Sequence, residues 1–259
     1  MFSLKGKTII ITGGSTHLGK AMSESVCKFG GNVVICSRNA ERCNEFAAQL
    51  NRQYSVECIG TYLDFCDESS IMALVSMVID KYNSIDVLIN NASFSVPDYV
   101  ENQSYEDFMK GLEGTIGGTF NVTSRVIKTM INQNHGNIIS VSSMYGVVSP
   151  KPSLYEDTCE FPNPSNYGSG KAAIIQFTKY LACNYAKYNI RANCIVPGAF
   201  PNIETQNNTR FIEKLKSEIP MSRIGKPEDL DGITVFLASE ASSYITGQSI
   251  HVDGGWTIW

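Results

Sequence analysis

The chain enters its first regular segment with Thr8-Ile9-Ile10-Ile11-Thr12-Gly13-Gly14-Ser15-Thr16-His17-Leu18-Gly19. The β-branched residues at its start predict a buried strand, and a helix is expected from about Leu18 to Phe29. A glycine-rich turn from strand to helix brings backbone amides and a helix N-terminus close to an anion. The stretch therefore predicts the first strand–helix unit of an α/β fold that binds a phosphate-bearing ligand.

The rest of the chain repeats this alternation of short apolar runs and helical patterns. Further strands are expected at residues 32–36, 55–62, 85–89, 137–141, 190–196 and 249–252. Helices are expected between them, and the longest covers residues 105–132. Uninterrupted strands of this kind are typical of a parallel sheet that is covered on both faces. We therefore expect one doubly wound, Rossmann-type domain of about seven strands, spanning residues 1–259.

Several residues with functional side chains or special backbone properties fall at the carboxyl ends of these strands. They are Thr12, Asn90, Ser143 and Pro197. In doubly wound sheets the ligand binds outside the carboxyl ends of the strands. The sequence therefore predicts that these four residues lie around one ligand site.

The segment Tyr167-Gly168-Ser169-Gly170-Lys171 begins a predicted helix and carries acid–base chemistry. Residues four apart share a helical face, so the Lys171 ammonium is expected close to the Tyr167 hydroxyl. A free phenol has a pKa of about 10, and a fixed cation nearby lowers it toward the working range. The pair is therefore predicted to transfer a proton.

Composition excludes several classes of function. The 259 residues carry a formal net charge of -4, which argues against a nucleic-acid or anionic-membrane surface. No apolar run is long enough to cross a membrane, and residues 1–7 leave no room for a signal peptide, so we expect a cytoplasmic protein. The eight cysteines form no C-x-x-C pair and are interpreted as reduced packing residues, except that Cys159, in a polar stretch near the expected site, is left open for a role there. His135 and His251 have no ligand partners at useful spacing, so no metal is predicted.

Taken together, the motifs resemble the short-chain dehydrogenase/reductase family over nearly the whole chain. The matching pieces are Thr12 to Gly19, Asp64, Asn90-Asn91-Ala92-Ser93, Ser143-Met144-Tyr145-Gly146, Tyr167 to Lys171, Pro197-Gly198, and Ile245 to Gln248 with Val252 to Gly255. The resemblance implies a dinucleotide cofactor and the interconversion of a carbonyl and an alcohol on a small molecule. It also implies a homotetramer or homodimer built on the long helices.

The resemblance assigns the cofactor site to the strand ends. Gly13 and Gly19 match the outer glycines of the family's turn, but His17 stands where its middle glycine is expected. Asp64 matches the residue that meets the adenine, and Asn90 matches a structural asparagine at the strand end. The other cofactor-binding residues that it implies are Ser15, Thr16, Leu18, Ala92, Tyr167, Lys171, Pro197 and Gly198.

The choice between NAD and NADP depends on the end of the second strand. An acidic residue at the Ser37 position would accept from the ribose hydroxyls of NAD, but the chain has Ser37 followed by Arg38. A guanidinium suits a phosphate. We therefore expect NADP to be preferred over NAD, although a solvated Arg38 would allow either cofactor.

The resemblance also assigns catalytic roles. Tyr167 would donate a proton to the carbonyl oxygen, Ser143 would hold that oxygen, and Lys171 would tune the phenol and hold the ribose hydroxyls. The family's fourth catalytic residue is an asparagine, and Thr115 occupies its position here. Its shorter hydroxyl puts the usual proton path beneath Lys171 in doubt.

Two segments are expected to shape the substrate pocket. Tyr167 follows Ser143 by 24 residues, about twice the family's usual spacing, so residues 150–166 are predicted to be an inserted, stiff, polar substrate loop. Tyr155 lies near the family's usual distance in sequence from Ser143. No lysine follows it four residues later, so it is not assigned as the catalytic tyrosine. Residues 198–217 are expected to form the second wall, where Arg210 and Lys214 either contact an acidic or phosphorylated substrate or are solvated.

The sequence leaves three functions open. The first is an oxidoreductase acting on a small polar substrate such as a sugar, a sugar acid or a sugar derivative, in line with a weaker resemblance to a flagellin or surface-glycan modification subgroup. The second is a nucleotide-sugar epimerase or dehydratase. The third is a dinucleotide-sensing protein with weak catalysis, which the departures at His17 and Thr115 suggest.

Overall fold

The computed structural model describes residues 1–259 and contains one seven-stranded parallel sheet. The strand order is β3-β2-β1-β4-β5-β6-β7, so the direction of winding reverses between β1 and β4. The strands are β1 (Thr8–Thr12), β2 (Asn32–Ser37), β3 (Ile59–Tyr62), β4 (Val87–Asn90), β5 (Gly136–Val141), β6 (Ile190–Pro197) and β7 (Ser249–Val252). The fold is the predicted Rossmann-type α/β arrangement.

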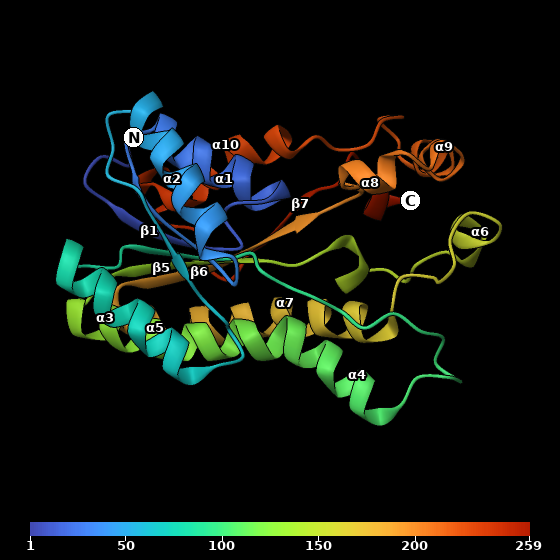
Figure 1. Ribbon diagram of the computed structural model, residues 1–259, viewed down its shortest axis with the longest axis horizontal. Coiled ribbons are helices and arrows are strands. Elements are labelled where there is room, and N and C mark those ends of the chain that lie inside the picture. The colour runs from blue at the N-terminus through green and yellow to red at the C-terminus, as the bar shows by residue number, and fades with distance from the viewer.

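Helices cover both faces of the sheet (Figure 1). One layer consists of α1 (His17–Lys28), α2 (Ala40–Gln53) and α10 (Asp231–Ala238). The other consists of α3 (Glu68–Tyr82), α4 (Tyr105–Leu112), α5 (Gly118–Gln133) and α7 (Ser165–Tyr185). Each layer buries its own hydrophobic cluster against the alternate side chains of the strands, which explains why the central strands are apolar on both faces.

The predicted helix at residues 105–132 is interrupted in the structure. A single π-turn at Glu113–Gly117 separates α4 from α5. A Cβ on Gly114 would lie 2.4 Å from the carbonyl oxygen of Phe94, so the glycine at this position lets the π-turn approach the loop after β4 closely. The helical periodicity on either side was predictable, but the extra residue in the turn was not.

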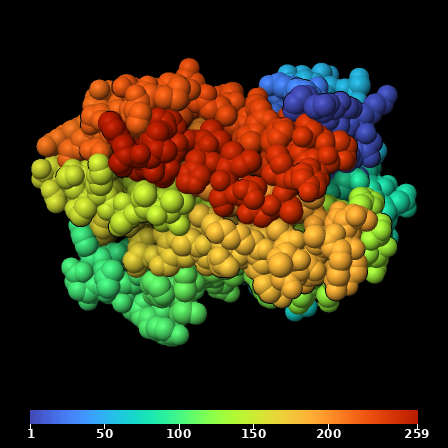
Figure 2. All heavy atoms as spheres, turned by 180° about the vertical axis from the view of Figure 1, so that it is seen from behind, coloured from blue at the N-terminus to red at the C-terminus, as the bar shows by residue number.

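Three short elements gather at one end of the molecule, beyond the carboxyl ends of the strands. They are α6 (Pro152–Tyr155), α8 (Ile203–Gln206) and α9 (Thr209–Glu218). Figure 2 shows the yellow-green segment that contains α6 directly beside the orange segment that contains α9. The inserted loop and the predicted second pocket wall are therefore neighbours in space.

Candidate active site

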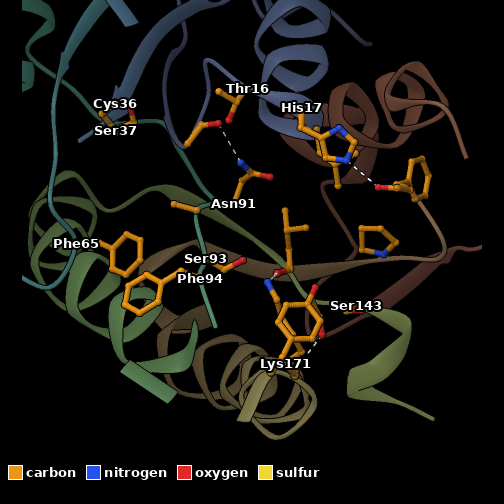
Figure 3. A pocket seen from close by; sticks show the side chains of 18 of the residues that line it. Thr16, His17, Cys36, Ser37, Phe65, Asn91, Ser93, Phe94, Ser143 and Lys171 are labelled. Atoms are coloured by element: carbon orange, nitrogen blue, oxygen red, sulfur yellow. Dashed lines mark hydrogen bonds between the residues drawn. The ribbon is translucent and has the colours of Figure 1, made fainter. Parts of the chain in front are cut away.

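The site is a cavity of about 450 Å³ at the carboxyl ends of the strands, next to the point where the winding reverses. It brings together most of the residues that the sequence assigned to catalysis and cofactor binding. These are Gly13, Thr16, His17, Leu18, Ser37, Arg38, Ala92, Ser143, Tyr167, Lys171, Pro197 and Gly198. Figure 3 shows Thr16 and His17 on one side of the cavity and Ser143 and Lys171 across from them.

The glycine-rich turn fits a ligand that approaches the backbone closely. Gly13 has a φ of 66°, and a Cβ there would lie 3.0 Å from Nδ2 of Asn91. A Cβ on Gly19 would lie 2.2 Å from the carbonyl oxygen of Gly13, so α1 can begin directly against the end of β1 only without a side chain there. The N-terminus of α1 thus faces the cavity, which is the arrangement that binds a dinucleotide pyrophosphate.

His17 takes the place of the middle glycine without closing the turn. Its backbone adopts a φ of 44°, in the left-handed region that histidine tolerates better than most side chains. The imidazole turns away from the turn, and Nε2 lies 2.8 Å from the carbonyl oxygen of Phe200, in the loop after β6. The departure from the family pattern therefore joins the cofactor turn to the predicted substrate wall.

Five predicted site residues lie outside the cavity lining. They are Ser15, Gly19, Asp64, Asn90 and Thr115. Ser15 is buried beneath the turn, and Asn90 donates from Nδ2 to the Thr123 hydroxyl at 2.8 Å. The Asp64 carboxylate accepts from the backbone amide of Cys66 at 3.0 Å, because it caps its own turn. Asn90 and Asp64 therefore hold the chain at and just after the strand ends, and none of the five residues lies on the cavity surface.

Sequence reasoning missed several lining residues. Asn91, not Asn90, faces the cavity, and its Nδ2 donates to the carbonyl oxygen of Thr12 at 3.0 Å. The rings of Phe65 and Phe94 stack at 5.8 Å between centroids, and both line the cavity (Figure 3). The other missed residues are Cys36, Leu63, Ser93, Val141, Ser142 and Phe200. The Asn-Asn-Ala-Ser motif was a usable signal for Asn91 and Ser93, but isolated loop phenylalanines gave none.

Helix α7 and the end of β5 position the candidate catalytic groups. Lys171 is buried and donates from Nζ to the carbonyl oxygen of Val141 at 2.9 Å. Its Nζ also lies 5.5 Å from the centroid of the Tyr167 ring, as the i, i+4 spacing predicts. The Ser142 hydroxyl donates to the carbonyl oxygen of Lys171 at 2.7 Å and ties this helix to β5. Ser143 follows directly and lines the same cavity.

The protonation of these groups differs from the sequence-based expectation. Burial raises the pKa of Tyr167, and the neighbouring Ser143 hydroxyl only partly opposes that shift. Burial lowers the pKa of Lys171 to about 8. The loss of solvent, not the lysine charge, therefore has the largest effect on the pKa of Tyr167 in this structure. Tyr167 is a neutral hydroxyl at neutral pH. A neutral phenol is the form that donates a proton.

Thr115 sits in the π-turn and directs its hydroxyl back into its own helix. Oγ1 donates to the carbonyl oxygens of Gly111 at 3.0 Å and Leu112 at 3.2 Å. A Cβ on Gly170 would lie 1.9 Å from this Oγ1, so α7 packs directly on the π-turn. Thr115 therefore supports the helix that carries Tyr167 and Lys171, and the structure shows no contact from it to Lys171.

The inserted segment is held by side chains of the neighbouring wall. Lys214 donates from Nζ to the carbonyl oxygens of Ser153 at 2.7 Å and Glu156 at 2.8 Å. Asn208 donates to the carbonyl oxygen of Thr158 at 2.5 Å, and Arg210 to that of Asp157 at 3.3 Å. Arg210 and Lys214 are thus neither simply solvated nor directed at the cavity. They dock the insert onto α9.

Known proteins resemble the chain over its whole length. A family model described as Enoyl-(Acyl carrier protein) reductase matches residues 14–257. The 3-oxoacyl-(acyl-carrier-protein) reductase FabG of Chlamydia trachomatis is 34% identical over 256 residues, covering 97% of this chain and 98% of the relative.

Solved structures share the fold as well. A short-chain type dehydrogenase/reductase from Mycobacterium marinum gives a TM-score of 0.91 at 27% identity, covering 100% of this chain and 98% of that one. A gluconate 5-dehydrogenase from Burkholderia cenocepacia, in complex with NADP and tartrate, gives 0.88 at 26% identity, covering 99% and 97%.

Fold, cavity and relatives together define an NAD(P)-dependent oxidoreductase that interconverts a carbonyl and an alcohol. The chain belongs to the short-chain dehydrogenase/reductase family, as its motifs indicated. No helix of the structure is both long enough and apolar enough to cross a membrane.

Proposed function

We propose that the protein is an NADP(H)-preferring oxidoreductase that interconverts a ketone and a secondary alcohol on a small polar substrate of the sugar or sugar-acid kind. The observation that carries this proposal is that Ser143 and Lys171 lie across the cavity from the glycine-rich turn (Figure 3), and that the Tyr167 ring, which lines the same cavity, lies 5.5 Å from Nζ of Lys171. The name of the gluconate 5-dehydrogenase relative supports a polar, polyhydroxylated substrate.

The chemistry that a dinucleotide held in this cavity would supply is hydride transfer to or from the carbonyl carbon. In the reducing direction, the neutral Tyr167 phenol donates its proton to the carbonyl oxygen while the Ser143 hydroxyl holds that oxygen. Lys171 keeps a positive charge behind the phenol and is itself fixed by the carbonyl oxygen of Val141. The oxidising direction is the reverse of this step, so Tyr167 must first be a phenolate, which then takes the proton of the alcohol.

The Tyr167→Phe variant tests this role. It removes the donated proton and keeps the ring, so the turnover number for ketone reduction should fall by about 10²–10⁴-fold while the dinucleotide still binds. Steady-state kinetics and cofactor titration measure the two effects. Near-normal turnover in this variant would exclude Tyr167 as the proton donor.

The substrate class requires a direct screen. Purified enzyme with each dinucleotide should turn over polyols, sugar acids or their keto forms, read by nicotinamide absorbance. An acetoacetyl thioester belongs in the same screen because the FabG relative is named for a 3-oxoacyl substrate. Conversion of nucleotide sugars without net cofactor change would favour the epimerase or dehydratase instead. Cofactor binding without any turnover would favour the sensor.

A further inference from the structure

A histidine of the glycine-rich turn is hydrogen-bonded to the start of the substrate wall. The turn, residues 13–19, and the segment that links β6 to α8, residues 198–202, both contribute residues to the lining of the active-site cavity. We call the second segment the wall loop. Nε2 of His17 lies 2.8 Å from the carbonyl oxygen of Phe200 (Figure 3). A carbonyl oxygen only accepts, so Nε2 carries the hydrogen and donates it.

The wall loop is otherwise held only from the side of β7 and the segment before α10. The backbone amide of Gly198 donates to the carbonyl oxygen of Val252 at 3.0 Å, and the carbonyl oxygen of Ala199 accepts from the amide of Gly225 at 2.9 Å. Beyond Phe200 the hydrogen bonds of the loop lead into α8, the next element of the chain. The bond from His17 is therefore the one hydrogen bond that fixes the loop to the glycine-rich turn.

The position of the wall loop matters because the loop forms part of the cavity surface. Gly198 and Phe200 line the cavity that also contains Ser143 and Tyr167. The chain then continues into α8 and α9, the predicted second wall. Reaction requires that substrate and cofactor are held in a fixed relative geometry. A contact that fixes this loop to the glycine-rich turn fixes the two halves of the cavity relative to each other.

His17 stands where the family pattern has a glycine, and a glycine has no side chain with which to form this bond. The backbone of His17 has a φ of 44°, a conformation that glycine adopts more readily than histidine. The side chain is exposed, so burial of the ring does not compensate for this strain. The structure shows one hydrogen bond from the ring, to Phe200.

We propose that His17 is a positioning residue, whose imidazole holds the main chain of Phe200 and so fixes the substrate wall relative to the dinucleotide. This inference rests on the oxidoreductase function proposed above and deepens it. His17 acts through Phe200 and takes no part in the proton transfer. Its contribution is therefore to substrate binding, and the chemical step is left to Tyr167, Ser143 and Lys171.

Two substitutions separate the hydrogen bond from the backbone conformation. His17→Asn removes the bond, because asparagine tolerates the left-handed region but its amide is too short to replace Nε2. His17→Gln keeps an N–H donor at a similar distance from the backbone. In the ligand-free protein, amide hydrogen exchange in residues 198–206 should be about three- to tenfold faster in His17→Asn, as the loss of one hydrogen bond allows. His17→Gln should stay within about twofold of the wild type.

Steady-state kinetics measure the consequence for the substrate. The probes are NADPH with 5-ketogluconate, a keto sugar acid, and NADPH with an acetoacetyl thioester. For the ketone that the wild-type enzyme reduces, His17→Asn should raise KM by about three- to tenfold and leave kcat within about twofold. The Kd of NADPH, from direct titration, should also stay within about twofold. His17→Gln should restore most of the wild-type KM.

His135→Asn is the matched control. It makes the same change at an exposed histidine that contacts Asp86 at the amino ends of the strands, so it should alter neither the exchange of the wall loop nor KM. Unchanged exchange in His17→Asn, or faster exchange with an unchanged KM, would overturn the proposal. An equal rise of KM in His17→Gln would overturn it as well, because the hydrogen bond would then not be the cause.

The proposed function and this inference fail in different ways. If no ketone of the screen is reduced although NADPH binds, the oxidoreductase function fails and the inference fails with it. If only the inference fails, the wild-type enzyme still reduces a ketone and Tyr167→Phe still abolishes that activity. An NADPH affinity that falls in His17→Asn by the same factor as KM rises would assign His17 to the cofactor and refute its role for the substrate.

Discussion

Burial sets the protonation of Lys171, and that has a consequence for activity. The ammonium is enclosed between α7 and the end of β5, and its pKa is lowered to about 8. The phenol of Tyr167 has a raised pKa and stays protonated throughout the neutral range. Of the two groups, only Lys171 therefore changes charge close to physiological pH.

We predict that ketone reduction weakens as the pH rises through about 8, because Lys171 then loses its positive charge while Tyr167 keeps its proton. On the acid side both groups are in the active form, so kcat/KM should be level there. A pH profile of kcat/KM measures this directly. In Lys171→Arg the falling limb should move to higher pH, because a guanidinium stays charged. A wild-type profile that remains level well above pH 8 would contradict the assignment.

Arg38 is the residue on which the cofactor preference depends. It lines the cavity at the end of β2, and its guanidinium carbon lies 6.0 Å from the centroid of the Phe94 ring. We predict that Arg38→Ala weakens NADP binding by about tenfold, because a charge-assisted hydrogen bond to phosphate is lost. NAD binding should change by less than about twofold. Arg42→Ala, in the first turn of α2 and outside the cavity lining, is the control for titrations with both dinucleotides.

The residues that were predictable are those whose position follows from local geometry. The i, i+4 relation placed Lys171 beneath Tyr167, and the strand-end rule brought Ser143 and Pro197 to one cavity. Phe65 and Phe94 were not predictable, because they meet only through the fold. The raised pKa of Tyr167 was not predictable either. The sequence shows that a lysine lies four residues away, but it does not show how deeply the two side chains are buried.

At the scale of elements, the contact between α7 and the π-turn is the tightest near the site. A Cβ on Gly170 would lie 1.9 Å from Oγ1 of Thr115. We predict that Gly170→Ala lowers the free energy of unfolding by about 1–3 kcal/mol, because α7 must move or Thr115 must rotate. Urea denaturation measures the change.

Gly232→Ala is the control for this prediction. Gly232 lies in α10, and a Cβ there would meet nothing within 4 Å. The substitution should raise the free energy of unfolding by roughly 0.5 kcal/mol, because alanine favours the helix. If the two variants have the same free energy of unfolding, the π-turn accommodates the added methyl group without loss of stability.

The elements themselves were largely predictable, since each strand and most helices carry their own periodicity. The break at Glu113–Gly117 was not, because the π-turn adds a residue without interrupting the helical pattern on either side. The inserted segment was expected to be a polar loop. In the structure it contains α6, and its Leu154 is buried in a cluster with α9, so a long-range contact decided its conformation.

At the scale of the whole molecule, α5 and α7 expose an aromatic face that the single chain does not cover. Phe120 is 54% exposed and Tyr180 is 55% exposed, and the ring of Phe120 lies 5.9 Å from that of Phe177. Contiguous exposed apolar surface of this kind marks an interface. The homodimer or homotetramer that the family resemblance implied would use these helices.

We predict that the protein is a dimer or tetramer in solution and that Phe120→Glu with Tyr180→Glu lowers its mass toward that of one chain. The charges would be buried without partners in the interface, which opposes association. Light scattering after size exclusion measures the mass. Phe29→Glu introduces a similar charge at an exposed aromatic position at the end of α1 and should leave the mass unchanged. A monomeric wild-type protein would refute the prediction.

The hydrogen bonds between α9 and the insertion have a further consequence for engineering. Lys214, Asn208 and Arg210 all reach main-chain oxygens, which every amino acid offers. The exposed residues beside these anchors, Ser153 and Glu156, can therefore be exchanged while the docking persists, whereas Leu154 and Tyr155 pack on α9. Libraries confined to Ser153 and Glu156 should vary the surface of the insertion without disturbing the dinucleotide half of the enzyme.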